Sequence, residues 1–341
     1  MKKILDTKYP IITTYTHHAH LLSILGTSSM TKFWIFSNYI QIYINRELNV
    51  NSWADFYFPM PYETRPFELC KWIEVQKNSE EFIDKNQGDI IKYIIDLIDN
   101  NYYVHLMINY RYLSKSRYNK KNVDARHDVL VYGYDSEIKT LYCADFMFET
   151  SKYSFCNCTY DEFYEAYNND FVKKQASYLN HNIYSYKLKK GCDYEFHINN
   201  IVYWIKQYIN SETPEYWKGY NYSNMNNIAW GISCYDILIQ NLKSIGITYI
   251  DVRFYCLLKD HKKIMIERLR FIENNTQLLK EYVEFFEEIY SEFVLIVNLV
   301  IKYNMTNNLK IIDKIVAKLT EIKNNEYETL VRLIDGLEVK S

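Results

Sequence analysis

Two predicted strands carry a histidine and an aspartate that are suited to proton transfer. Alternating apolar residues predict strands over 129–134 and 140–145, and the segment between them, centred on Ser136, has the composition of a turn. A hairpin closed around Ser136 places His127 directly opposite Asp145, where an imidazole can donate a hydrogen bond to a carboxylate. A register shifted by two residues would remove this opposition, and the plainer alternative is a surface histidine beside a strand-end aspartate. We expect His127 to act as a base that Asp145 orients.

A base of this kind needs a nucleophile, and the expected position does not hold one. Thiol enzymes carry the nucleophilic cysteine at the N-terminus of a buried helix, where the helix dipole favours the thiolate. The sequence predicts a helix that begins near His18, but no cysteine occurs in residues 16–23. Ser23, Ser28 and Ser29 are alternative nucleophiles, although each lies further along the helix or beyond it.

Three histidines at the start of the same helix offer metal binding as a different chemistry. They are His17, His18 and His20. Helical neighbours meet at a spacing of three or four residues, so only His17 and His20 could share an ion. A third ligand would have to come from elsewhere in the chain. We take histidines on a cleft wall or a helix surface as the plainer interpretation, and we expect neither a metal nor a cofactor.

The first half of the chain alternates helices and strands. Apolar residues at helical spacing predict three helices, over 18–26, 31–46 and 90–98. Gly26 is a candidate C-cap of the first helix, and Asp89 is a candidate N-cap of the third. Strand-like alternation adds a third strand over 103–110. Thr159 and Glu162 match a capping box, which predicts another helix from about residue 160.

The strand pattern fades after about residue 194. Apolar residues then recur at helical spacing, most regularly over 282–300 and 311–322. The sequence therefore predicts two domains, residues 1–190 and an all-helical domain over residues 191–341. The expected fold class is α+β, with an antiparallel sheet in the N-terminal domain.

The two strands that carry His127 and Asp145 resemble those of a known group of enzymes. Segments 126–135 and 141–146 are similar to the histidine and aspartate strands of the double-glycine-leader cysteine peptidases and their relatives. More narrowly, the chain resembles the butirosin-biosynthesis-protein-H-like family, which joins a papain-like N-terminal domain to a helical C-terminal one. That family has a His-Cys pair at the start of its first helix, and His18-Ala19 matches the pair with alanine in place of cysteine. A still narrower similarity is to the amide-forming enzymes of closthioamide-type polythioamide assembly.

The resemblance implies acyl transfer in natural-product (nonribosomal, antibiotic) biosynthesis. An acyl chain would pass from the phosphopantetheine thioester of an acyl or peptidyl carrier protein to the enzyme thiol, and an amine would then attack to form an amide. His127 would activate the thiol, Asp145 would orient His127, and backbone N–H groups of the first helix would hold the oxyanion. Because Ala19 cannot form an acyl-enzyme, the resemblance implies an inactivated variant or a pseudoenzyme.

Composition and charge limit the partners and the location that we expect. The 40 Lys and Arg against 42 Asp and Glu give a formal net charge of −2, so electrostatics provide no case for binding nucleic acid. No apolar run is long enough to span a membrane, and the N-terminus lacks the apolar core of a signal peptide. Seven cysteines without framework spacing fit reduced thiols. We therefore expect a cytoplasmic protein.

Two other functions remain open from the sequence. One is a binding or scaffold protein that presents a basic face to an acidic carrier protein. Lys187, Lys189, Lys190 and the run over 259–263 supply the charge, although such runs are more often solvated faces. The other is a cysteine peptidase.

Overall fold

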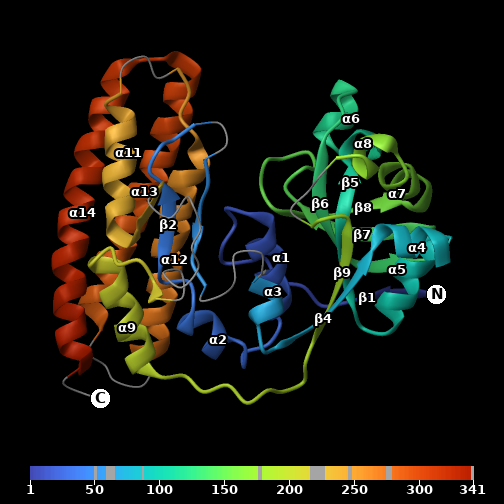
Figure 1. Cartoon of the computed structure of the whole chain (residues 1–341), viewed down its shortest axis with the longest axis horizontal. Helices are drawn as coiled ribbons and strands as arrows, with labels where there is room; N and C mark the ends of the chain where they lie inside the picture. The colour runs from blue at the N-terminus through green and yellow to red at the C-terminus, as the bar shows by residue number, and fades with distance from the viewer. Residues whose placement is uncertain are drawn as a thin grey trace. The chain divides into compact units, whose positions relative to one another are not determined.

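The chain folds into two compact units in a computed structural model. The structure describes residues 1–49, 52–58, 66–86, 88–175, 179–215, 227–244, 248–273 and 279–338. One unit, the sheet unit, comprises Met1–Lys32 and Thr64–Asp193, and the other, the helical unit, comprises Phe33–Glu63 and Tyr194–Ser341 (Figure 1). The predicted division at residue 190 lies close to the change of unit at Asp193. The assignment of residues 33–63 to the same unit as the C-terminal half was not predicted.

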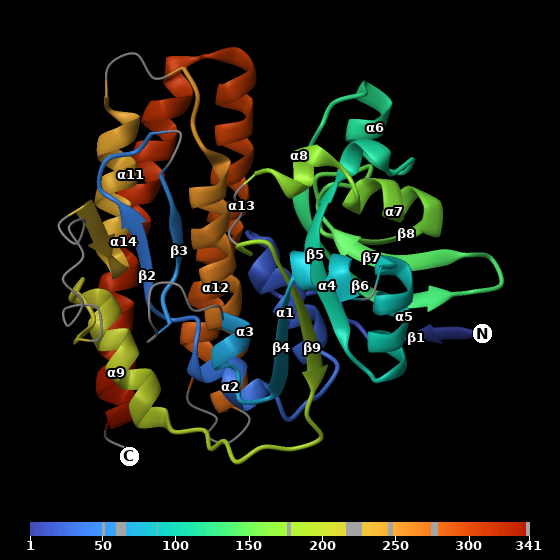
Figure 2. The ribbon, with the colours of Figure 1, turned by 45° about the vertical axis from the view of Figure 1, so that its right-hand side comes forward.

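The sheet unit is built on an antiparallel sheet of seven strands. An antiparallel sheet in this part of the chain was predicted from the sequence. The strands follow the order β4-β9-β5-β6-β7-β8, and β1 pairs with β6 (Figure 2). Their bounds are β1 (Lys2–Ile4), β4 (Ile73–Ser79), β5 (Tyr103–Asn109), β6 (Arg126–Asp135), β7 (Thr140–Asp145), β8 (Ser154–Thr159) and β9 (Asn182–Leu188).

Helices cover both faces of this sheet. They are α1 (Thr16–Leu25), α3 (Pro66–Leu69), α4 (Glu80–Asn86), α5 (Ile90–Asp99), α6 (Arg117–Lys121), α7 (Tyr160–Tyr167) and α8 (Asp170–Lys173), with the 3₁₀ turn η1 (Tyr110–Tyr112). The predicted caps are confirmed: Asp89 accepts the Ile91 N–H at 2.8 Å, the Thr159–Glu162 capping box starts α7, and Gly26 is the C-cap of α1.

The alternation along β5 sorts side chains between the two faces. Val104, Leu106 and Ile108 lie in one apolar core with residues of α5 and α7. His105, between them in sequence, points to the opposite face and contacts His20 of α1, with 4.9 Å between the ring centroids. The sheet therefore has an apolar face under α5 and α7 and a face with buried polar groups under α1 (Figures 1 and 2).

The helix predicted over 31–46 was wrong in its second half. Helix α2 covers only Lys32–Ser37, and β2 (Ile42–Asn45) follows it. Strand β2 pairs with β3 (Ala54–Phe56) and with β10 (Ile228–Trp230) in a three-stranded antiparallel sheet of the helical unit. The apolar run suited a helix by spacing, but the alternately buried β-branched Ile42 and Ile44 form a strand once partners are available.

The helical unit is a bundle with this small sheet packed against it. Its helices are α2, α9 (Ile198–Ile209), α11 (Cys234–Leu242), α12 (Val252–Glu273), α13 (Lys280–Thr306) and α14 (Leu309–Glu338), with the 3₁₀ turn η3 (Gly231–Ser233). Strand β10 contradicts the prediction of an all-helical region after residue 194. It was missed because three residues are too few to show the alternation of a strand. Among the described helices, none is long and apolar enough to cross a membrane.

Two buried side chains of α12 fasten the end of α2 and the chain between α2 and β2 to the bundle. Arg268 donates from Nε to the Phe36 carbonyl at 2.8 Å and from Nη2 to the Tyr39 carbonyl at 3.1 Å. His261 donates from Nε2 to the Ile40 carbonyl at 2.8 Å. These side chains donate to buried backbone carbonyls that have left the hydrogen-bonding pattern of a helix or sheet. A segment from the first sixth of the chain is thereby held by a helix of the C-terminal half.

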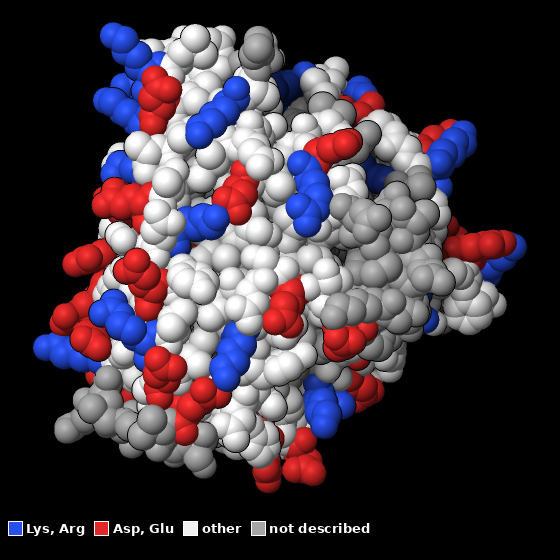
Figure 3. Space-filling view, turned by 60° about the vertical axis from the view of Figure 1, so that its left-hand side comes forward, with Lys and Arg blue, Asp and Glu red and all other residues white. Residues whose placement is uncertain are grey.

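The run over 259–263 does not form the basic face that the sequence suggested. Lys262 is fully buried and forms an ion pair with Glu326, which also accepts the Tyr235 hydroxyl at 2.6 Å. Asp260 and His261 are buried as well. Figure 3 shows basic and acidic side chains interspersed on one face of the molecule. The charge pattern of this run reflects a polar network inside the bundle.

His261 should make the stability of the protein depend on pH. Burial and the positive charges of Lys262 and Arg268 lower its pKa well below the usual range, against the opposing effect of its bond to Ile40. Below its unfolded pKa of about 6.5 the unfolded chain binds a proton that the folded chain does not, so stability falls as pH falls. From pH 7.5 to 5.5 this residue alone should remove roughly 1 kcal/mol from the free energy of unfolding.

His261→Gln should reduce that pH dependence by the same amount in urea unfolding followed by circular dichroism. A glutamine amide can keep the donor to Ile40 and the acceptor for Lys262 without titrating. The variant and the unchanged protein should therefore differ little at pH 7.5, which serves as the internal control. A variant with the full original pH dependence would contradict this role for His261.

Candidate active site

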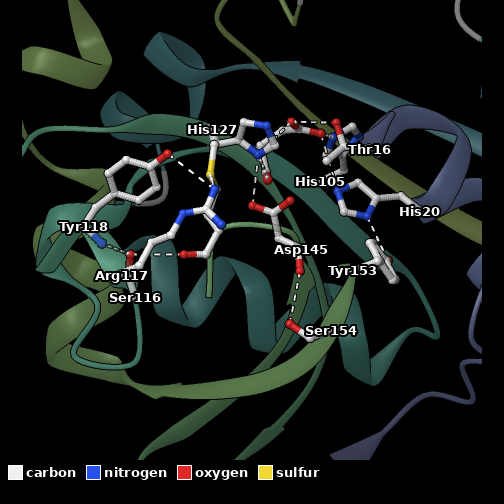
Figure 4. Close-up of polar contacts among 12 residues, drawn as sticks. Thr16, His20, His105, Ser116, Arg117, Tyr118, His127, Asp145, Tyr153 and Ser154 are labelled. Atoms are coloured by element: carbon white, nitrogen blue, oxygen red, sulfur yellow. Dashed lines mark hydrogen bonds and ion pairs between the residues drawn. The ribbon is translucent and has the colours of Figure 1, made fainter. Parts of the chain in front are cut away.

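The structure brings the predicted base and acid together. His127 lies at the start of β6 and Asp145 at the end of β7, and His127 Nδ1 is 2.9 Å from Asp145 Oδ2 (Figure 4). Asp145 is fully buried, whereas 27% of the His127 side chain is exposed. Because Nδ1 faces the carboxylate, Nε2 on the far side of the ring is the nitrogen left for a ligand. A buried acid and an accessible imidazole form the orienter and base of a proton-transfer pair.

The register of the two strands that produces this contact differs from the predicted register. The turn holds four residues, 136–139, and the register shifts between Val131 and Gly133. Leu130 then pairs with Ala144, and continuing that register sets Asp145 opposite Val129. The predicted direct opposition of His127 and Asp145 was therefore wrong by two residues. The contact survives because side chains two positions apart across neighbouring strands share a face and lie within reach of each other.

Two carboxylates act on the charge of His127. Its Nδ1 is 2.9 Å from Asp145 Oδ2 and 3.4 Å from Asp128 Oδ1. Burial lowers the pKa of His127, but the charges of Asp145 and Asp128 outweigh it and raise the pKa to about 10. The ring is therefore an imidazolium at neutral pH, able to donate a proton or to pair with an anion.

A tyrosine that the sequence did not single out packs beside this pair. Tyr110 is fully buried at the end of β5, and its ring meets that of His127 edge-on at 6.4 Å between centroids. Burial, followed by the charge of Asp145, raises the pKa of the Tyr110 hydroxyl well above its usual range. The hydroxyl thus stays protonated. In the sequence Tyr110 is one more apolar strand residue, with no spacing to distinguish it.

Asp128, next to His127 in sequence, is the centre of a buried polar cluster. Its Oδ1 accepts the Thr16 hydroxyl at 2.9 Å, and its Oδ2 lies 2.8 Å from His105 Nε2 and 3.4 Å from His20 Nε2. Burial alone would raise the pKa of Asp128, but the charge of His127, the bond from His105 and the nearby His20 ring hold it well below the usual range. Burial lowers the pKa of His105 to about 4, against the raising effect of Asp128, so that ring is neutral.

These contacts tie the start of α1 to the strand that carries His127. Thr16 and His20 stand one helical turn apart and both reach Asp128. Ala19 is three residues after Thr16, so the two side chains lie on the same side of the helix. Ala19 is fully buried. Its own N–H donates to the Tyr15 carbonyl at 3.0 Å, so this amide is not available to an oxyanion. An oxyanion donor would have to be another group.

The two histidines whose spacing would have allowed them to share an ion, His17 and His20, face different neighbours. The His17 ring stacks on Tyr15, with 5.7 Å between centroids, while His20 faces His105 on the sheet. The helix therefore directs these two rings to different neighbours. His20 instead meets partners from β5 and β6 that sequence spacing could not supply.

No known protein family matches this sequence, and no curated protein matches it either. The candidate site is therefore defined by its own geometry: a base–acid pair on β6 and β7, and a helix whose first turn is bonded to the residue after the base.

Replacing Thr16 tests how much the buried carboxylate depends on α1. Thr16→Val keeps the shape of the side chain but leaves Asp128 Oδ1 without its hydroxyl donor. Because hydrogen bonds to charged groups contribute more than neutral ones, the free energy of unfolding should fall by about 1.5–3 kcal/mol. Urea unfolding measures this change.

Thr27→Val, after the other end of the same helix, is the matched control. The Thr27 hydroxyl donates to the neutral Ile24 carbonyl at 2.7 Å, and its loss should cost about 0.5–1.5 kcal/mol. Equal costs for the two variants would show that the Thr16–Asp128 bond has no special weight.

Proposed function

We propose that the sheet unit is an acyl-transfer domain of the thiol-enzyme type in which position 19 is the nucleophile position. The observation that carries the proposal is the 2.9 Å contact between His127 Nδ1 and the fully buried Asp145. A buried carboxylate that fixes the tautomer of a part-exposed imidazole is the arrangement that acyl-transfer enzymes use. The antiparallel sheet beside a buried helix is the support that a papain-like fold would give it.

The proposed reaction uses these residues in two steps. A thiolate at position 19 attacks the thioester carbonyl of a carrier-bound acyl chain, and His127 protonates the departing phosphopantetheine thiol. An amine then attacks the acyl-enzyme and releases the amide, and His127 takes up the proton that the amine loses. Asp145 holds the ring in place throughout. With Ala19 the first step has no nucleophile, so the present chain would bind the acyl donor without being acylated.

The carrier protein, its phosphopantetheine thioester and the amine acceptor follow from the family resemblance and from this chemistry. A cytoplasmic location fits the same reading. No cofactor is needed for either step, because the nucleophile, the base and the orienting acid are side chains.

A binding or scaffold protein without catalysis is the second candidate, and two observations favour it. Ala19 offers only a methyl group, and its backbone N–H is already bonded to Tyr15. A pseudoenzyme could keep the His127–Asp145 pair to hold an anionic group of its partner. Restoring a thiol at position 19 separates the two candidates.

Ala19→Cys should create a reactive thiolate. A helix N-terminus and a nearby imidazole both lower a cysteine pKa from its usual ~8.5 to about 3.5–7.5. Iodoacetamide at pH 6.5 should therefore alkylate Cys at position 19 at least about tenfold faster than an ordinary thiol. Peptide mass spectrometry distinguishes this site from the seven native cysteines. A carrier-bound acyl thioester should then add its acyl mass to the intact chain.

Ser23→Cys is the matched control, because it places a thiol one turn further along the same helix. Adding His127→Ala to Ala19→Cys should return the alkylation rate to that of the control, and adding Asp145→Ala should lower it in part. If Ala19→Cys reacts no faster than Ser23→Cys, position 19 is not preorganised for nucleophilic chemistry and the binding-protein candidate stands.

A further inference from the structure

The contacts of His20 allow it to turn a lone pair towards the sheet. The Ser23 hydroxyl donates to the His20 carbonyl at 2.8 Å, and the Tyr153 hydroxyl donates to Ser23 Oγ at 3.5 Å. The Tyr153 oxygen is also 2.9 Å from His20 Nδ1, and when Tyr153 donates to Ser23 it accepts from His20 there. In that arrangement a neutral His20 is protonated at Nδ1 and presents a lone pair at Nε2.

That lone pair is aimed at a negative charge. His20 Nε2 is buried and has no hydrogen-bond partner among the described residues, yet it lies 3.4 Å from Asp128 Oδ2. Two electron-rich atoms face each other where water cannot screen them, which is unfavourable unless a cation lies between them. The cation must be a proton on Nε2 or a metal ion.

A third donor converges on the same point. His105 Nε2 is 2.8 Å from Asp128 Oδ2, and the three donor atoms all lie within 4.8 Å of one another. Ligand atoms about 2.0–2.2 Å from a tetrahedral ion stand roughly 3.3–3.6 Å apart. The His20–Asp128 separation already has this value, and the His105–Asp128 separation is shorter because a proton bridges it. Helix α1, β5 and β6 each supply one of these ligands.

The outer contacts of the two imidazoles suit metal ligation. Tyr153 is bonded to Nδ1 of His20 (Figure 4). Tyr186 lies 3.0 Å from Nδ1 of His105. Ligating histidines commonly donate their second N–H to such a partner, which fixes the tautomer. Because a tyrosine hydroxyl can accept as well as donate, Tyr186 can hold His105 after its Nε2 proton has been displaced. The Thr16 hydroxyl holds the other oxygen of Asp128.

We propose that His20 Nε2, His105 Nε2 and Asp128 Oδ2 bind one divalent transition-metal ion of the zinc class. Two imidazoles and one carboxylate are donors that such ions prefer, whereas calcium and magnesium favour oxygen ligands. The burial of all three residues favours a structural ion that fastens α1 to the sheet. His20 is one of the histidines that the sequence offered for a metal, and β5 and β6 supply the ligands that it lacked there.

Zinc binding to the tag-free full-length protein tests this proposal. After treatment with EDTA, the protein is titrated with Zn²⁺ both in the native state and during refolding from urea, because the site is buried. We expect one zinc per chain by elemental analysis and a raised thermal unfolding temperature. His20→Gln and Asp128→Asn should each abolish the stoichiometric zinc. Tyr153→Phe, which removes only an outer contact, should weaken binding by about 10- to 100-fold.

His181→Gln is the control, because His181 is partly exposed and lies outside the cluster. Zinc binding by this variant should equal that of the unchanged protein. Failure to bind zinc more tightly than about 100 μM in either titration would overturn the proposal and assign the cation between His20 and Asp128 to a proton. Zinc that persists in His20→Gln would overturn it as well. Neither outcome bears on the reactivity of a thiol at position 19, so the proposed function is tested separately.

Discussion

The buried carboxylate of Asp128 is the interaction on which the sheet unit depends most. An ionised group without water must be compensated, and here the compensation comes from Thr16 of α1, His105 of β5 and His127 of β6. Each of these contacts fixes an element relative to the others. The position of α1 on the sheet is therefore set by charge as well as by apolar packing, and the base–acid pair lies at one end of that arrangement.

In the helical unit the buried charge that must be compensated is positive rather than negative. The guanidinium of Arg268 is fully buried there, and burial lowers the pKa of this group to about 9. Backbone carbonyls at Phe36 and Tyr39 accept its hydrogen bonds. Lys262, by contrast, is paired with Glu326, and burial lowers its pKa although Glu326 opposes the shift. In both units, buried charges hold together segments that are distant in sequence.

Sequence reasoning succeeded where the signal was local. The cap at Asp89, the capping box at Thr159 and the strand periods of β5, β6 and β7 all depend on residues within a few positions of one another. The His127–Asp145 contact was also predicted, although through a register that was wrong by two residues. The error was harmless because a shift of two keeps every side chain on the same face of a sheet.

Sequence reasoning failed where an element depends on a distant partner. Strands β2 and β10 form because they pair with each other, although more than 180 residues separate them, and neither has a period that identifies it alone. The Asp128 cluster was missed for the same reason. In the sequence Asp128 is a single polar residue next to His127. Its contacts with Thr16, His20 and His105 exist only in the folded unit.

The segment between α2 and β3 has a consequence for the order in which the protein can be completed during synthesis. Carbonyl groups at its start accept hydrogen bonds from His261 and Arg268. Strand β2 within it pairs with β10, near residue 229. At about 5–20 residues per second, on the order of ten seconds or more pass between the emergence of this segment and that of α12. During most of that interval β2 can pair with β3, but its other edge and the carbonyl groups of Phe36, Tyr39 and Ile40 lack their native partners. The helical unit therefore cannot be completed before most of the chain has been made, and until then the early segment exposes groups that are buried in the folded unit.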